Sequence, residues 1–310
     1  MCGIVILNYN TSSETIECIE SVKRECEGGD YHIYVVDNAS SDESVAFFEK
    51  KYRNDSAISV IASKSNLGYS GGNNIGIKAA LNDGCSYIFL VNSDVIFEND
   101  VVSIVQECLK KNANVLTAGP AVHLKDGSYS QFARKPLDLH AYKLEKKPWS
   151  ILLKNKARKA RFYNYDINKD FVFSGMFSGC CIGFKKEYFD SFGFLDDNIF
   201  LFYEEDVIAH LLCKENKKAM ICANAKVMHN EGTSMRNTDA GRLLTTRLYR
   251  WPTSIYVLNR YAGVCYRKCS EFNRNDHIRW KALALLNQAY KDNYEKYDKE
   301  SSRLATLMNK

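Results

Sequence analysis

Residues 87–94 read Tyr-Ile-Phe-Leu-Val-Asn-Ser-Asp, an apolar run that ends abruptly in polar residues. The pattern occurs twice earlier, as Gly-Ile-Val-Ile-Leu-Asn-Tyr-Asn at residues 3–10 and as Tyr-His-Ile-Tyr-Val-Val-Asp-Asn at residues 31–38. A shorter run of residues that favour strands occurs at residues 59–62. Short apolar runs of this kind are typical of buried strands. The sequence therefore predicts four strands, at 3–7, 31–36, 59–62 and 87–91.

Helical patterns fill the gaps between these strands. Residues 14–26 carry Ile16, Ile19 and Val22 on one stripe, and Ser41 opens a capped helix. The glycine-rich stretch 66–76 leads into a helix that ends near Asn82. Strands that alternate with helices predict βαβ crossovers, and hence an α/β fold with a mostly parallel sheet buried on both faces.

A polar cluster follows three of the four strands. Ligands bind at the carboxyl ends of the strands in such sheets, so these clusters should meet at one edge. Each cluster alone would suit an ordinary turn or helix cap. Together they predict a site with two carboxylates, Asp37 and Asp94, able to hold a divalent cation and through it a nucleoside diphosphate. The clusters are Asn8–Thr11, Asp37–Ser40 and Asn92–Asp94.

Composition and missing motifs exclude several classes of protein. The 310 residues are 45% hydrophobic and 25% charged, as in globular proteins and unlike disordered or collagenous ones. The phosphate loop Gly-x-x-x-x-Gly-Lys does not occur, and the glycines between 68 and 76 do not form the dinucleotide motif Gly-x-Gly-x-x-Gly. The sequence thus argues against a kinase, an NTPase and a dehydrogenase.

Cysteine usage and hydropathy bear on the compartment. No apolar run approaches the roughly 18 residues of a membrane span, and no basic stretch precedes the first apolar run as in a signal peptide. The eleven cysteines include no Cys-x-x-Cys pair, which favours reduced and mostly buried thiols. We therefore expect a cytoplasmic location.

The motifs, taken in order, resemble those of family 2 glycosyltransferases. The likeness covers about residues 3–234, and it is greatest to the bacterial rhamnosyl- and galactosyltransferase-like branch. No single motif is specific, but their joint order is. The segments that carry it are 4–10, 35–42, 66–76, 90–95, 178–179, 193–196 and 200–206, followed by His229, Gly232 and Ser234.

The resemblance implies the GT-A fold, with a catalytic domain over residues 1–235 and a helical C-terminal extension over 236–310. The nucleotide-binding half would be 1–95 and the acceptor-side half 96–235. It also implies an inverting mechanism and a nucleotide-sugar donor held through Mg²⁺ or Mn²⁺. By the same resemblance, Asn8 and Asn10 lie in the loop over the nucleobase, and Asp37 accepts a hydrogen bond from the base. The loop that approaches the nucleotide contains Asn66, Gly72 and Asn73.

The metal-binding motif departs from the family pattern. Asn92, Ser93 and Asp94 stand where the family has Asp-x-Asp, so the first carboxylate has become an amide. Asn92 and Ser93 are expected to contact the donor, and metal affinity should depend on Asp94 and the diphosphate. His229 matches the position at which an imidazole can complete the coordination of the metal.

Glycosyl transfer needs a carboxylate base for the acceptor hydroxyl, and Glu204, Glu205 and Asp206 are the candidates. An acidic helix start favoured by the macrodipole is the alternative interpretation. Projected from the stripe of Val207 and Ile208, Glu204 falls in line, Glu205 at the edge and Asp206 nearly opposite, towards solvent. Counting from the family's Phe-Leu also points to Glu205 as the base.

Two basic segments stand out against a slightly acidic remainder. Residues 143–161 carry eight Lys or Arg and one Glu, and residues 260–281 carry six against two. We expect residues 143–165 to form a mobile loop near the acceptor side. The first basic segment, with Trp149 and residues 151–153 as apolar anchors, is expected to bind anionic membranes. Beyond residue 234, one or two amphipathic helices are predicted at 236–262. Another is predicted at 276–290, with Ile278, Leu283, Leu286 and Tyr290 on its stripe, followed by an exposed or frayed tail.

These observations predict a glycosyltransferase that moves one sugar from a UDP- or dTDP-sugar to a glycan acceptor, most of all a lipid-linked surface polysaccharide such as O-antigen, at the inner face of the cell membrane. The alternatives are a sugar nucleotidyltransferase, a nucleic-acid-binding module and, because of Asn92, an inactive nucleotide-sugar-binding protein. Residues 8–13 lack the first class's glycine-rich basic signature. No recognition motif supports nucleic acid as a partner.

Overall fold

One sheet organises the computed structural model, which describes residues 1–130, 132–146, 154–230 and 239–309. Through these residues nine strands are joined, in the order β3-β2-β1-β4-β8-β6-β9-β5, with β7 paired to β9. The strands are β1 (Cys2–Asn8), β2 (Tyr31–Asp37), β3 (Ile58–Ala62), β4 (Tyr87–Asn92), β5 (Val95–Phe97), β6 (Val115–His123), β7 (Phe171–Phe173), β8 (Cys181–Lys185) and β9 (Lys218–His229).

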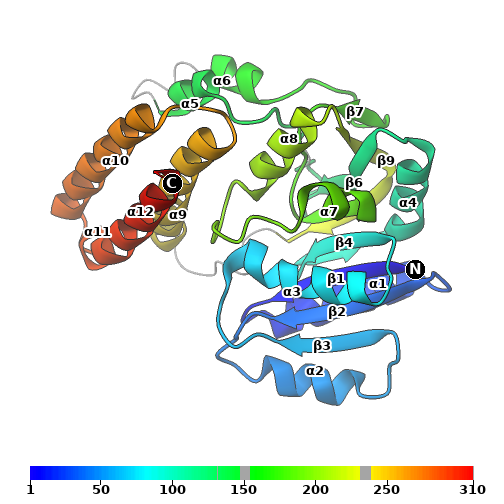
Figure 1. Ribbon diagram of the computed structural model, residues 1–310. Coiled ribbons are helices and arrows are strands. Elements are labelled where there is room, and N and C mark those ends of the chain that lie inside the picture. The colour runs from blue at the N-terminus through cyan, green and yellow to red at the C-terminus, as the bar shows by residue number, and fades with distance from the viewer. Residues whose placement is uncertain (131, 147–153, 231–238, 310) are drawn as a thin grey trace.

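The first four strands are parallel, as predicted. β1 pairs in parallel with β2 and β4, and β2 with β3 (Figure 1). β8 is antiparallel to both β4 and β6. The helices are α1 (Ser12–Glu25), α2 (Ser44–Tyr52), α3 (Gly68–Asn82), α4 (Val101–Lys111), α5 (Leu139–Lys146), α6 (Lys154–Arg161), α7 (Lys186–Phe192), α8 (Glu204–Lys214), α9 (Asp239–Arg260), α10 (Tyr266–Leu286), α11 (Gln288–Asp292) and α12 (Tyr294–Met308).

Alternating side chains of the strands pack against helices on both faces of the sheet. On β1, Ile4 and Ile6 join the core under α1, α2 and α4, while Val5 joins the core under α3, α7 and α8. A strand whose side chains are buried on both faces reads as a continuous apolar run. The α/β fold class predicted from the sequence is therefore confirmed.

One predicted helix start differs from the observed one. α2 begins at Ser44 instead of Ser41, because the carboxylate of Asp42 accepts a hydrogen bond from the Ser44 amide at 3.1 Å and residues 41–43 form a bend before the helix.

The segment from 143 to 165 is not simply a loop. It contains the end of α5 and all of α6, because Ala141 and Tyr142 on α5 have a core to join, with α8, α9 and α10. The predicted apolar anchors, Trp149 and residues 151–153, lie outside the described residues, as do Gly232 and Ser234.

The C-terminal helices pack together at one side of the molecule (Figure 1). Trp280 of α10 is fully buried and stacks on Tyr297 of α12 with ring centroids 4.3 Å apart. The predicted stripe on this helix is partly wrong, because α10 turns Trp280 inward and leaves Ile278 and Leu286 exposed. The tail forms α12, whose Leu304 is buried. The division of the chain at residue 235 remains a prediction.

Most of the cysteine side chains are buried, as the sequence predicted. All eleven cysteines are free thiols, and eight of them are buried. None of the described helices is long and apolar enough to cross a bilayer.

Candidate active site

The carboxyl ends of β1 and β2 are joined by a buried carboxylate. Asp37 Oδ1 accepts hydrogen bonds from Asn8 Nδ2 at 2.7 Å and from the Ser40 hydroxyl at 2.6 Å. Its Oδ2 accepts the Ser40 amide at 2.9 Å. Asp37 is only 1% exposed, so these contacts fix the two loops to each other. Asn8 and Asp37 thus lie together, as the sequence predicted for the first two clusters.

Two residues in these loops have left-handed backbone conformations. Asn10 has φ 55° and Ala39 has φ 60°, values that cost energy for residues other than glycine and recur at functional sites. Asn10 is exposed, and its Oδ1 accepts the Ser41 amide at 2.8 Å. Tyr9 beside it is 41% exposed, which makes it an aromatic ring at the rim of the site that the sequence analysis did not single out.

The glycine-rich segment is held to the same loops by Asn38. Asn38 Nδ2 donates to Asn66 Oδ1 at 3.0 Å and to the Gly68 carbonyl at 3.1 Å. A side chain at Gly72 would stand 2.6 Å from Leu7 Cδ1, so this glycine lets α3 pack closely on β1. Asn73 is buried and donates to the Tyr69 carbonyl at 2.9 Å, and its Oδ1 accepts no hydrogen bond from the described residues.

The predicted metal ligands lie against each other. Strand pairing places β5 beside the end of β9, and His229 Nε2 is 3.1 Å from Asp94 Oδ1. Asp94 is buried, and Ser93 Oγ is 3.0 Å from Thr11 Oγ1. The backbone of Asn92 is fixed by its amide, which donates to the Cys180 carbonyl at 2.8 Å.

This donor set is incomplete for a metal taken alone. Among the described residues, no group of three or more His, Cys, Asp or Glu side chains is arranged so that it could hold a metal ion. A carboxylate oxygen and an imidazole nitrogen suit Mn²⁺, and Mg²⁺ is commonly held by one or two carboxylates together with substrate phosphates. The pair therefore fits a metal whose remaining ligands come from a diphosphate.

The helix of candidate bases starts from a strained turn. Phe202 and Tyr203 have φ values of 72° and 71°, a conformation that bulky residues rarely adopt. α8 begins directly after them at Glu204. The turn is held in place because Tyr203 is buried in the core shared with the C-terminal helices.

Glu204 is a buried acid. Its carboxyl lines a cavity of about 190 Å³, and its Oε1 has no hydrogen-bond partner among the described residues. Burial raises the pKa of Glu204 to about 8, and the neighbouring charge of Glu205 adds to that rise. The prediction that Glu204 lies in line with the buried stripe is confirmed.

Glu205 lies against the backbone of Gly179, directly before Cys180. A side chain at Gly179 would come within 2.7 Å of Glu205 Oε1, so the missing side chain leaves room for this carboxylate. Burial, followed by smaller contributions that include the charges of Asp94 and Glu205, raises the pKa of the Cys180 thiol to about 12. The Cys180 carbonyl accepts the Asn92 amide at 2.8 Å, so residues 179 and 180 connect Glu205 to the motif that carries Asp94. The side chain of Glu205 remains 21% exposed.

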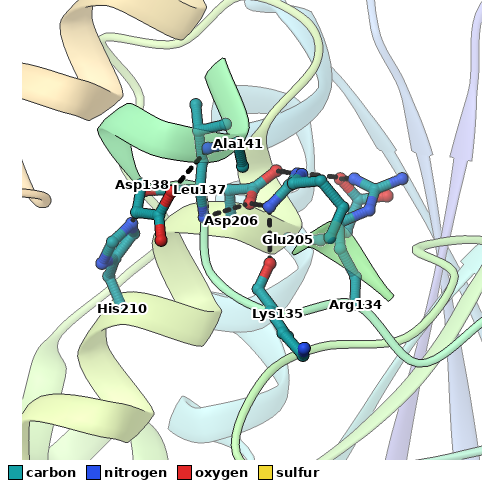
Figure 2. A network of polar contacts seen from close by, with 9 residues as sticks. Arg134, Lys135, Leu137, Asp138, Ala141, Glu205, Asp206 and His210 are labelled. Carbon is teal, nitrogen blue, oxygen red and sulfur yellow. Dashed lines mark hydrogen bonds and ion pairs between the residues drawn. The ribbon is translucent and has the colours of Figure 1, made fainter. Parts of the chain in front are cut away.

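Asp206 does not face solvent, and the helix projection was wrong on this point. It is fully buried, and its carboxylate accepts the Leu137 amide at 2.9 Å (Figure 2). The same carboxylate pairs with Arg161 at 2.9 Å. The projection assumed that only the stripe of Val207 and Ile208 is covered. Residues 134–137 and α6 cover the opposite side of α8.

Arg134 completes this network and was missed by the sequence analysis. Its Nη1 lies 3.5 Å from Asp206 Oδ2 and 3.9 Å from Glu205 Oε2. The guanidinium sits 4.4 Å from the centroid of the Phe132 ring, within cation–π distance. No motif marks Arg134 or Arg161 in the sequence, since both lie in segments without periodicity. Arg134 is thus the cation closest to the candidate base among the described contacts.

Comparisons with known proteins agree with this geometry. Residues 3–193, more than half of the chain, match the family model described as Glycosyl transferase family 2. Glycosyltransferase GlyG of Streptococcus pneumoniae is 26% identical over 117 residues, which are 37% of this chain and 38% of GlyG. Low-salt glycan biosynthesis hexosyltransferase Agl10 of Haloferax volcanii is 22% identical over 231 residues, 74% of this chain and 67% of Agl10. The match thus spans well under half of the first relative and about two thirds of the second.

Solved structures share the fold. GalNAc-T7 with UDP, GalNAc and Mn²⁺ matches with a TM-score of 0.56 at 11% identity, covering 95% of this chain and 58% of the other. TarS 1–349 of S. aureus in complex with UDP matches with a TM-score of 0.50 at 11% identity, over 84% of this chain and 70% of TarS. At such identities the likeness shows the fold alone, and it confirms the GT-A architecture.

Proposed function

The chain belongs to glycosyl transferase family 2, and from this membership and the geometry of the site we propose that it transfers one sugar from a UDP- or dTDP-sugar to a glycan acceptor with inversion. The observation that carries the proposal is the pairing of Asp94 with His229, together with residues 179 and 180, which contact both Glu205 and the strand end that carries Asp94. We propose that the Asp94–His229 pair serves the leaving diphosphate and that Glu205 serves the attacking hydroxyl.

The nucleoside would lie over the loops after β1 and β2. Asn10 and Tyr9 are exposed there, and both Asp37 and Asn8 hold the loops from beneath. Exposed aromatic rings stack on nucleobases, so we propose Tyr9 as a base-stacking residue beside the predicted donor-binding set. GalNAc-T7 and TarS have been crystallised with UDP, which supports a uridine nucleotide as the first donor to test.

We propose that Asp94 and His229 hold the divalent metal, with Asn92 contributing an uncharged contact. When bound, the metal would act as a Lewis acid that stabilises negative charge on the departing diphosphate. Asp94 is buried directly before β5, and the pairing of β5 with β9 fixes the proposed metal position.

Glu205 is the proposed base. Its carboxylate takes the proton of the acceptor hydroxyl while the oxygen forms a bond to the anomeric carbon and the bond to the nucleoside diphosphate breaks. Attack from the face opposite the leaving group inverts the configuration. Proton removal of this kind contributes typically about 10² to 10⁴ in rate. Arg134, 3.9 Å away, is proposed to orient Glu205.

The acceptor is proposed to be a lipid-linked glycan of the cell envelope, handled at the cytoplasmic face of the membrane. The similarity to a hexosyltransferase of glycan biosynthesis, Agl10, supports a glycan acceptor.

Release of nucleoside diphosphate from a panel of UDP-, dTDP- and GDP-sugars, with Mg²⁺, with Mn²⁺ and with a chelator, tests this function. We expect turnover with a UDP- or dTDP-sugar in the presence of metal and a glycan acceptor. Thermal stabilisation by the nucleotide sugar without any release would instead indicate an inactive nucleotide-sugar-binding protein.

A further inference from the structure

The outward face of α10 carries the most exposed large apolar side chains among the described residues. Ile278 is 60% exposed, Leu285 88% and Leu286 86%. Positions seven and eight residues apart lie on one face of a helix, so the three side chains form one stripe. Single exposed apolar residues are ordinary, but a stripe of three on one helix marks an interaction surface.

The inner face of α10 packs against the rest of the protein. Trp280 is fully buried and donates its indole N–H to the Tyr290 carbonyl at 3.1 Å. Cys269 and Asp276 are buried as well. The orientation of α10 is therefore fixed by its core contacts. The outward stripe is a consequence of that orientation.

A row of cations runs beside the stripe. Arg267, Arg274 and Lys281 are spaced by seven residues and all three are exposed. Seven residues are close to two helical turns, so the three charges line up along the helix. Apolar residues on the outer face, flanked by Lys and Arg, are typical of helices that lie in the interface of a membrane.

The other basic segment lies next to this helix. Tyr142 of α5 packs on Phe272 of α10 with ring centroids 5.0 Å apart. Lys143 on α5 and both Lys156 and Lys159 on α6 are exposed. The fold thus brings α5, which carries the start of the first basic segment, beside α10 of the second, although about a hundred positions separate the two segments in sequence.

We propose that α10 docks on the surface of an anionic lipid bilayer, with Ile278, Leu285 and Leu286 entering the boundary between headgroups and acyl chains. The basic row on α10, with the exposed Lys143 of α5 and both Lys156 and Lys159 of α6, would face the anionic headgroups. The charge complementarity selects this occupant over an uncharged protein surface. The proposal differs from the membrane contact predicted at residues 149–153, and it does not depend on the sugar-transfer activity.

Flotation of the full chain with phospholipid vesicles tests the proposal directly. We expect the wild-type chain to float with vesicles of phosphatidylcholine and phosphatidylglycerol, and not with phosphatidylcholine alone. Binding should fall as salt rises, because the screening length shrinks from about 10 Å at 0.1 M to about 3 Å at 1 M. The double variant L285Q/L286Q should lose at least tenfold in partitioning, and R274Q/K281Q should lose binding mainly at low salt.

Matched variants elsewhere serve as controls. Phe47→Gln removes a side chain that is 50% exposed on α2, and K50Q/K110Q removes two exposed charges on α2 and α4. Both should float like the wild type. Near-wild-type melting temperatures would show that the leucine variant is folded. Wild-type binding by L285Q/L286Q, absence of binding at low salt, or a change of oligomeric state on substituting the leucines would each overturn the proposal, the last by showing that the stripe meets protein.

Discussion

Glu205 and Asp206 are adjacent acids with different surroundings, and this difference decides which of them can take a proton from a substrate. Glu205 is partly exposed beside Gly179, whereas Asp206 is fully buried and paired with Arg161. We expect Glu205→Gln to keep donor affinity and to lose at least about 10² in turnover, as removal of a general base does. Calorimetric binding and steady-state turnover of the same preparation provide the measurement.

Asp206→Asn is the informative comparison for that experiment. Its turnover per folded molecule should fall much less than that of Glu205→Gln. A dead but well-folded Asp206→Asn with intact donor affinity would move the role of base to Asp206.

Asp94 and His229 should differ in their effect on metal. Asp94 brings the charge at this motif because Asn92 is neutral, so Asp94→Ala should abolish the metal dependence of donor binding. His229→Ala should only weaken it. Titration of UDP with and without Mn²⁺ measures both, and an unchanged metal dependence in Asp94→Ala would contradict the assignment.

Glu204 should make stability depend on pH. Its pKa is about 8 in the folded protein and near the ordinary value of about 4.3 in the unfolded chain. Between these values the folded state binds more protons, so the free energy of unfolding falls as pH rises from about 4 to about 8. Glu204→Gln should remove this loss and raise the melting temperature at pH 8, with little difference near pH 4. Thermal unfolding across that range is the measurement, and parallel curves for both proteins would contradict the prediction.

Among the elements, α8 is joined to the end of α6 by a buried ion pair. Arg161 and Asp206 are 45 residues apart, and Arg161 also donates to the Lys135 carbonyl at 2.5 Å. Removing one member of a buried pair typically costs about 3–5 kcal/mol, because the other charge is left without its partner.

We therefore expect Arg161→Met and Asp206→Leu to destabilise the protein strongly when made singly. The double variant should cost clearly less than the sum of the two single costs. Chemical denaturation of the four proteins of this cycle measures the coupling. Additive costs would show that the pair contributes nothing to the attachment of α8.

The sequence predicts the fold correctly where the apolar pattern of a segment matches its burial in the structure. The first four strands follow from apolar runs that are buried on both faces, and Asp94, Asn8 and Asp37 follow from what comes directly after those runs. The surroundings of Asp206 could not be predicted, because they depend on a charged segment 45 residues away. The outward turn of Ile278 could not be predicted either, since Trp280, two residues later, determines which face is buried.

For the whole molecule, the C-terminal helices and the base-bearing helix share one core. Val207 of α8 and Tyr203 before it pack with Leu258 of α9 and Leu304 of α12. We expect a chain that ends at residue 235, the predicted domain boundary, to expose these side chains and to aggregate. Solubility and the melting temperature of the truncated protein test this, and a soluble, cooperatively folding fragment would show that the extension is a separate unit.

The antiparallel strand β8 has a consequence for synthesis. β4 is complete at Asn92, but its second neighbour β8 begins only at Cys181, about 90 residues later. A ribosome adds about 5–20 residues per second, so the nascent chain carries an uncovered strand edge for on the order of 10 s. Unpaired edges invite association with other chains. We expect translation stalled within this window to recruit chaperones, and stalling beyond residue 185 to release them.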